Sequence, residues 1–183
     1  MATTIQTFFE QAKSRQFARD FLFRVKQINI TAGPGNAGGL AFNGETDLVY
    51  ARTATLPGRA IQNKVANYFG QQFNVPGKSE YTNSEGFSIE FYHEESVDLR
   101  KKFEDASRAV FDNATSIGDY YMPGEESKII LNVLNISLEE TDTIELVGAS
   151  IRNIGEVQYN IADGTGEILT FPVTFAYHYY NRF

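Results

Sequence analysis

The chain has 183 residues, of which 42% are hydrophobic and 21% charged, and it contains no cysteine. This composition predicts one globular domain with a sizeable core, and it excludes disulfides, thiolate metal sites and cysteine nucleophiles. The net charge is −7, and the acidic excess lies in residues 96–183, with seven basic and fourteen acidic side chains. No basic face for tight DNA binding is visible, so the acidity indicates either a solubilising surface or one that repels a passing polyanion.

The first predicted elements are a short helix and a bulged strand. Phe8 and Phe9 lie on one apolar stripe of a helix over residues 3–14. From Asp20 the apolar residues alternate, and the alternation later shifts by one residue. This pattern indicates a strand with a β-bulge near Gln27.

The glycine-rich stretch GPGNAGG at residues 33–39 fits the G-x-G-x-x-G pattern of dinucleotide-binding loops. Such a loop must lead into a helix whose free N–H groups meet the phosphate. Here it leads to Asn43 and Gly44, a turn signal, and then to residues that favour strands. Pro34 also removes a backbone donor. We therefore expect a mobile loop between strands and no cofactor.

Three strands are predicted next, at residues 47–56, 64–75 and 87–92. The first is expected to end at Leu56, Pro57 and Gly58, and the second at Pro76 and Gly77. In the second strand, one predicted face carries Val65, Asn67, Phe69, Gln71 and Phe73, and the other carries Ala66, Tyr68, Gly70, Gln72 and Asn74.

A helix beginning at Ser96 follows, with Ser96 as its cap. Its predicted buried stripe is Leu99, Phe103, Ala106 and Val110. Residues 112–127 are polar and predict a loop, and strands are expected at about 128–138, 142–151 and 167–180. This order predicts a mainly β, α+β fold: an antiparallel β-sandwich or barrel with one packed helix.

The residues that could support catalysis or metal binding do not form a recognisable site. His93 and His178 have no partner at zinc-like helical spacing, so each is expected at a strand end or on the surface. Glu139, Glu140 and Asp142 lack the EF-hand pattern and predict a solvated hairpin turn. The sequence contains no nucleophile elbow and no Walker motif. We therefore expect no metal site and no enzymatic activity.

Several strands have a second face that is only weakly polar. In the strand at 167–180, Thr174, Ala176, His178 and Tyr180 lie opposite a face made of Phe171, Val173, Phe175, Tyr177 and Tyr179. Such faces indicate contacts with another subunit or a sheet that is covered on both sides within the monomer. The sequence leaves both alternatives open.

Six blocks of sequence stand in a fixed order along the chain. They are ARDFLFRV at 18–25, ATLPG at 54–58, NYFGQQFNVPG at 67–77, FSIEFYHEESVDLRKKFEDA at 87–106, VGASIRNIGEVQYNI at 147–161 and FPVTFAYHYY at 171–180. In this order they resemble the tail tube protein of contractile-tailed, T4-like bacteriophages. The resemblance runs from about Phe17 to Tyr179 and so extends over nearly the whole chain. The stretches at 31–46 and 112–127 are longer than is usual in this family, and Asn153 stands near a position where the family often has a Pro-Thr-Asn turn.

The resemblance implies a structural virion protein with one tail-tube domain over residues 1–183 and an N-terminal arm at 1–16. Hexameric rings would stack into a tube inside a contractile sheath, with the subunits joined into a continuous inner β-barrel. The implied partners are the sheath, baseplate and tail terminator proteins, with the tape measure protein and genomic DNA in the lumen and no membrane insertion.

Two groups of residues become candidates under this interpretation. The candidates for the lumen are Gln71, Gln72, Asn74, Glu139, Glu140 and Asp142. The candidates for contacts between subunits are Phe8, Phe9, Asn36, Tyr68, Tyr120, Tyr121 and Tyr180. The loops at 31–46 and 112–127 are expected to bridge rings or to touch the sheath. The alternatives are the tube of a phage-derived injection or secretion system, a baseplate protein that initiates the tube, and a monomeric β-barrel binding module.

Overall fold

The computed structural model describes residues 19–31, 40–43, 51–82, 84–96, 98–118, 121–160 and 166–183, together with residues 5 and 164. Within these ranges the chain forms helix α2 and strands β1 to β13, and the paired strands run antiparallel. The predicted helix at 3–14 and the glycine-rich loop fall almost wholly outside the described residues. The mainly antiparallel β fold with one described packed helix is the predicted one, although its sheets do not close into a barrel.

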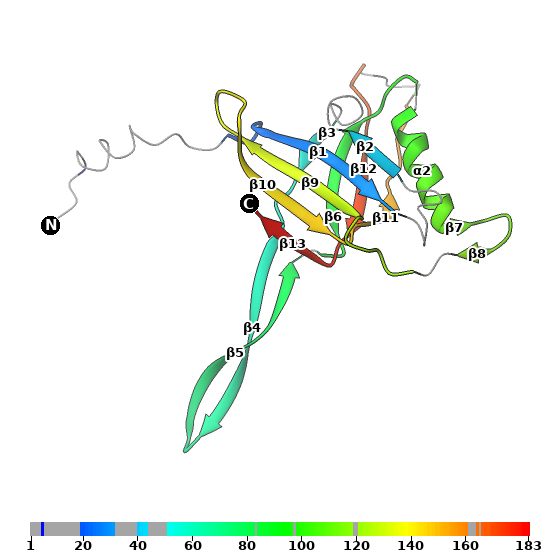
Figure 1. Cartoon of the computed structure of the whole chain (residues 1–183). Coiled ribbons are helices and arrows are strands. Elements are labelled where there is room, and N and C mark those ends of the chain that lie inside the picture. Colours follow the sequence, from blue (N-terminus) through cyan, green and yellow to red (C-terminus); the bar gives the residue numbers. More distant parts are fainter. Residues whose placement is uncertain are drawn as a thin grey trace.

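The larger sheet has five strands in the order β13-β10-β9-β1-β2 (Figure 1). Its strands are β1 (Phe23–Ile30), β2 (Leu40–Asn43), β9 (Lys128–Leu134), β10 (Glu140–Val147) and β13 (Tyr179–Arg182). The register of β1 against β9 shifts between Val25 and Gln27, which confirms the predicted bulge. Because of this extra residue, Val25 and Ile28 both point into the core although they are three residues apart.

The smaller sheet has four strands in the order β11-β12-β6-β3. They are β3 (Ala51–Ala54), β6 (Phe87–Tyr92), β11 (Ser150–Ile154) and β12 (Thr170–Ala176). The alternation in β6 and β12 is as predicted, because Phe87, Ile89, Phe91, Phe171, Val173 and Phe175 are all buried. These side chains form the core with residues from the five-stranded sheet.

Helix α2 (Asp98–Val110) packs against β2 and β11, the end strands of the two sheets. Its predicted stripe is confirmed for Leu99, Phe103 and Ala106, which are buried. The ring of Phe103 lies within 6.4 Å of four other core phenylalanine rings. Val110 is 39% exposed, because the last turn of the helix leaves the core.

The start of the helix differs from the prediction. The helix begins at Asp98, whose carboxylate lies in the first turn. The hydroxyl of Ser96 donates a 2.8 Å hydrogen bond to the carboxylate of Glu94. The Ser96 hydroxyl therefore binds the side chain of Glu94 instead of acting as the predicted cap.

The sequence predicted single strands at 142–151 and 167–180. In the structure each of these ranges is divided into two strands, one in each sheet. The first splits at Gly148 between β10 and β11, and the second splits at Tyr177 and His178 between β12 and β13. The two breaks are adjacent, since the N–H of His178 donates to the carbonyl oxygen of Val147 at 2.9 Å. The prediction placed Tyr177 and Tyr180 on opposite faces of one strand. This was wrong, because Tyr180 packs against the core as Tyr177 does.

The predicted loop at 112–127 contains a short ladder between β7 (Phe111–Asp112) and β8 (Ile117–Gly118). Asp112 closes its turn, because its carboxylate accepts hydrogen bonds from the Thr115 hydroxyl and the Ala114 N–H. The Thr115 bond, followed by the Ala114 bond, lowers the pKa of Asp112 below its usual range.

Candidate assembly surface

The hairpin formed by β4 (Gly58–Tyr68) and β5 (Gln71–Thr82) projects from the body of the molecule (Figure 1). All of its residues except Tyr81 are exposed, so it has no core of its own. At its base the ring of Tyr81 meets Tyr180 at 5.4 Å and Tyr177 at 6.5 Å. This aromatic contact ties the hairpin to the core while the rest of it stands in solvent.

This hairpin corrects the prediction of a single strand at 64–75. The chain reverses at Phe69 and Gly70, between the paired residues Tyr68 and Gln71. Both turn residues have positive φ, 47° at Phe69 and 76° at Gly70, as a type I′ turn requires. Sequence reasoning missed the turn because its first position normally holds Asn, Asp or Gly, and a phenylalanine there carries backbone strain.

The predicted strand end at Pro76 and Gly77 was also wrong, because both residues lie inside β5. The register between the two strands shifts between Ile61 and Asn63, opposite this part of β5. A β-carbon at Gly77 would lie 2.7 Å from the carbonyl oxygen of Gln62. Glycine therefore allows a bulge in which the two backbones approach closely.

The reversal changes which side chains share a face. Cross-strand partners point the same way, so one face of the outer hairpin carries Lys64, Ala66, Tyr68, Gln71, Phe73 and Val75. The other face carries Asn63, Val65, Asn67, Gln72, Asn74 and Pro76. The predicted faces were therefore wrong beyond the turn. We call the first set the apolar face and the second the amide face.

The hairpin also differs from the rest of the chain in charge. It carries Arg59, Lys64 and Lys78 against a single acidic residue, Glu80. Its net charge is therefore positive within a chain whose total is −7. Lys64 and Lys78 lie nearer the tip than Glu80, whose carboxylate accepts a hydrogen bond from the side-chain amide of Gln62.

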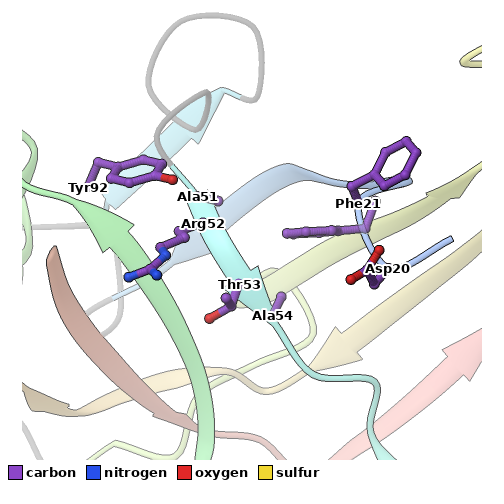
Figure 2. Close-up of a pocket in the computed structure, with 8 residues that line it drawn as sticks. Asp20, Phe21, Ala51, Arg52, Thr53, Ala54 and Tyr92 are labelled. Carbon is purple, nitrogen blue, oxygen red and sulfur yellow. The ribbon is translucent and has the colours of Figure 1, made fainter. Parts of the chain in front are cut away.

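A pocket of about 510 Å³ lies beside β3 and the start of β1. It is lined by Asp20, Phe21, Phe23, Ala51, Arg52, Thr53, Ala54 and Tyr92. Figure 2 shows Phe21 and Asp20 to one side of β3 and Tyr92 to the other. Phe21 is 71% exposed, and Arg52 has an ion pair of 3.4 Å with Glu90. We call it the β1–β3 pocket; three of its eight lining residues are aromatic, and its charged groups are Asp20 and Arg52.

The acidic candidates for the lumen lie at or near the turn between β9 and β10, where the sequence predicted a hairpin turn. Glu139 closes the turn by hydrogen bonds with Asn135. Glu140 pairs with Arg24 at 2.6 Å and with Lys26 at 3.1 Å. The hydrogen bond from Lys26 lowers the pKa of Glu140, and the charges of both cations lower it further.

Asp142, the third acidic candidate, is also paired. It forms a 2.7 Å ion pair with Arg182 of β13. Lys128 and Glu145 pair similarly at 2.8 Å across β9 and β10. Much of the acidic charge on these strands is thus matched by a cation on a neighbouring strand, which the sequence alone did not indicate.

The remaining candidates are dispersed or lie outside the described residues. Gln72 and Asn74 share the amide face, whereas Gln71 lies on the apolar face. Tyr68 and Tyr121 are exposed, and Tyr180 is half-buried. The candidates outside the described residues are Phe8, Phe9, Asn36 and Tyr120, together with most of the loop at 31–46.

The histidines are placed as expected, at a strand end and on the surface. His93 follows β6, and its Nε2 lies 2.7 Å from the hydroxyl of Tyr159. His178 is exposed at the corner between β12 and β13. Within the described ranges, no group of three His, Cys, Asp or Glu side chains is arranged to hold a metal ion. Nor does any helix in that part of the chain have the length and apolarity to cross a membrane.

Comparison with known proteins gives likenesses of fold. No protein-family model matches the chain, and no curated protein matches it. A chain of the 6-fold symmetrised anti-feeding prophage baseplate aligns with a TM-score of 0.60 and 11% identity, over 92% of this chain and 97% of that one. A chain of the PVC sheath/tube terminator, from an extracellular contractile injection system in the extended state, aligns with a TM-score of 0.59 and 10% identity, over 93% and 99%.

A chain of the cap that terminates the anti-feeding prophage tube gives a TM-score of 0.58 and 10% identity, over 92% of both chains. These three alignments span nearly the whole of each chain, so they compare complete folds. The predicted resemblance to contractile-tail tube proteins is therefore confirmed at the level of the fold.

Proposed function

We propose that the chain is a structural subunit of the tube of a contractile particle, and that its copies assemble into rings that stack. The observation that carries this proposal is the β4–β5 hairpin, a long element that buries almost nothing within its own chain. An exposed strand pair with apolar side chains is a hazard for a monomer but is the means of association for an assembly subunit.

The exposed aromatic surface of the hairpin is large enough to contribute substantially to an interface. Tyr68, Phe69 and Phe73 are 68%, 90% and 50% exposed. At about 200 Å² for an aromatic side chain, they leave roughly 400 Å² of aromatic surface in solvent. A standard interface covers about 800 Å² on each partner, so these three side chains supply about half of that area.

The finer parts of the proposal concern symmetry, partners and activity. We propose hexameric rings joined through their sheets, a surrounding sheath, and a baseplate and terminator at the two ends. The tape measure protein and DNA occupy the lumen, and the subunit itself catalyses no reaction. The likenesses to a 6-fold symmetrised baseplate and to a sheath/tube terminator support the sixfold rings and the sheath, baseplate and terminator partners.

Electron microscopy of the purified protein tests the assembly. We expect rings or hollow tubes in negative stain as protein concentration rises. Phe73→Asp places a charge on the apolar face and should prevent them, whereas Asn74→Asp, its neighbour on the amide face, should leave them intact. Particles that stay monomeric at all concentrations and salts, even with a nucleating baseplate, would refute the proposal and favour a monomeric binding module.

A second candidate is a ring that starts or ends the tube rather than the subunit repeated along it. It is favoured by the likenesses to a baseplate chain, a sheath/tube terminator and a tube-terminating cap. The same images distinguish the two, because a repeated subunit forms long tubes and a terminal ring stops at one or two layers. The cargo is a separate question, and a DNA-packaging gene beside this one would indicate a phage rather than an injection device.

A further inference from the structure

We propose that the tip of the β4–β5 hairpin, with Phe69 as its anchor, inserts into the β1–β3 pocket of a second copy of this chain. This rests on the proposed function, because it specifies one of the contacts by which the subunits assemble. The two surfaces of that contact, the hairpin tip and the pocket, both consist of described residues.

The first half is the strained tip. Phe69 is 90% exposed and has a φ of 47°, in the left-handed region that side chains other than Gly, Asn and Asp rarely adopt. The ring of Tyr68 lies against it edge-on, with centroids 4.6 Å apart. The free monomer thus holds two aromatic rings in water on an unfavourable backbone, an arrangement that burial in a partner would offset.

The second half is the receiving pocket. Its volume of about 510 Å³ is within the range of sites that hold a compact ligand. Phe21, Phe23 and Tyr92 supply aromatic walls for a ring to pack against. Arg52 also lines the pocket, and its side chain lies on the Tyr92 side of β3 (Figure 2), where a guanidinium can stack on an inserted ring.

The chain cannot fill its own pocket. Only three residues separate β3, which lines the pocket, from the start of β4. From there the hairpin runs away from the body (Figure 1). The 11 residues of β4 place the tip roughly 35 Å from the hairpin base, at about 3.3 Å per residue. The occupant must therefore be the hairpin of another molecule.

Charge favours a second copy as that molecule. The hairpin is positive, with Lys64 on the apolar face four residues before Tyr68, while the whole chain carries −7. At the pocket, Asp20 is an acidic lining residue, and the charge of Arg52 is matched by its ion pair with Glu90. Tip and pocket are different surfaces, so the contact is head-to-tail and repeats from copy to copy, as a ring or a stack requires.

Site-directed crosslinking tests this pairing cleanly, because the chain has no cysteine. One chain carries Gln71→Cys at the tip. A second chain, which is affinity-tagged, carries Thr53→Cys at the pocket. A short bismaleimide crosslinker is added after the two chains have assembled. We expect a mixed dimer joined at these two positions, identified by peptide mass spectrometry. The matched control replaces Thr53→Cys by Lys101→Cys, at an exposed position of α2 that does not line the pocket. Adding Phe69→Ala to the tip chain should reduce the mixed product at least tenfold.

The outcomes separate this inference from the proposed function. If rings or tubes form but crosslinking at Thr53→Cys is no stronger than at Lys101→Cys, the tip-in-pocket contact is overturned and the tube function stands. Crosslinking that survives Phe69→Ala undiminished overturns the role of Phe69 as anchor. No assembly under any condition overturns both proposals together.

Discussion

The imidazole of His178 lies against the α-carbon of Gly148, with no room for a side chain between them. A β-carbon at Gly148 would be 2.8 Å from both Cγ and Nε2 of His178, and closer still to Cδ2. Gly148 also has a φ of 69°, in the left-handed region. These two residues sit where β10 passes to β11 and β12 passes to β13, so this contact fixes the corner at which the chain changes sheets.

Gly148→Ala should therefore lower the free energy of unfolding by about 2–4 kcal/mol, through backbone strain and the clash with His178. His178→Ala removes the clash but not the strain, so the double variant should recover only part of the loss. Urea denaturation of the two single variants and the double variant measures this coupling. Strictly additive losses would show that the ring contact does not constrain the corner.

Phe103 should be among the most sensitive core positions. It is fully buried from α2, and its ring lies 4.6 Å from that of Phe42 and 5.3 Å from that of Phe91. Phe103→Ala should cost about 3–5 kcal/mol of unfolding free energy, by lost burial and the cavity left behind. Val110→Ala, in the same helix at 39% exposure, is the control and should cost far less. Similar losses for both would mean that α2 does not complete the core.

The sequence was sufficient to predict an element wherever a single physical signal, such as alternation or helical periodicity, determined its structure. Alternation placed β6 and most of β12 correctly, and the shift in alternation located the bulge of β1 near Gln27. Helical periodicity identified the buried side of α2 as far as Ala106. In each of these elements, one sheet face or helix stripe is buried against a single core, so the pattern reports burial directly.

The sequence was insufficient to predict the structure where contacts between distant segments override local conformational preference. Nothing local indicates that Phe69 adopts a positive φ, so the hairpin was predicted as one strand. The change of sheet at Gly148 depends on the approach of His178, which is 30 positions away in the sequence. The β1–β3 pocket joins residues near 20, 52 and 92, and no pattern within one segment could bring them together. One local signal could have predicted the hairpin turn: Gly70 lies between two segments in which apolar and polar residues alternate.

Stability should fall in acid partly through Glu140. Its pKa is lowered in the folded protein, first by the hydrogen bond from Lys26. The unfolded chain therefore binds the proton more readily, so the stabilisation is fully present above the ordinary pKa of about 4.5 and is lost as pH falls through the lowered value. Glu140→Gln should lower the urea midpoint at pH 7 and make little difference near pH 3. Glu95→Gln, at an exposed site, is the control, and an equal effect of Glu140→Gln at both pH values would contradict the ion pairs.

Phe69→Asn should separate the stability of the monomer from its assembly. Asparagine accepts a positive φ, and Asn-Gly is the favoured pair for a type I′ turn, so the isolated hairpin should be stabilised by about 0.5–1 kcal/mol. Slower amide exchange in β4 and β5 would report this gain. The same change removes the exposed ring, so sedimentation and negative-stain images should show weaker assembly at equal protein concentration.

The control for this variant is Ile168→Asn, which removes a side chain of similar exposure away from the hairpin. It should leave both amide exchange in the hairpin and the degree of assembly unchanged. If Phe69→Asn assembles as well as the unaltered chain, the strained turn is a feature of the monomer and not a device for association. If both variants weaken assembly equally, the cause is general loss of apolar surface rather than the tip. A gain in hairpin stability together with a selective loss of assembly is the combination that only an anchoring role for Phe69 predicts.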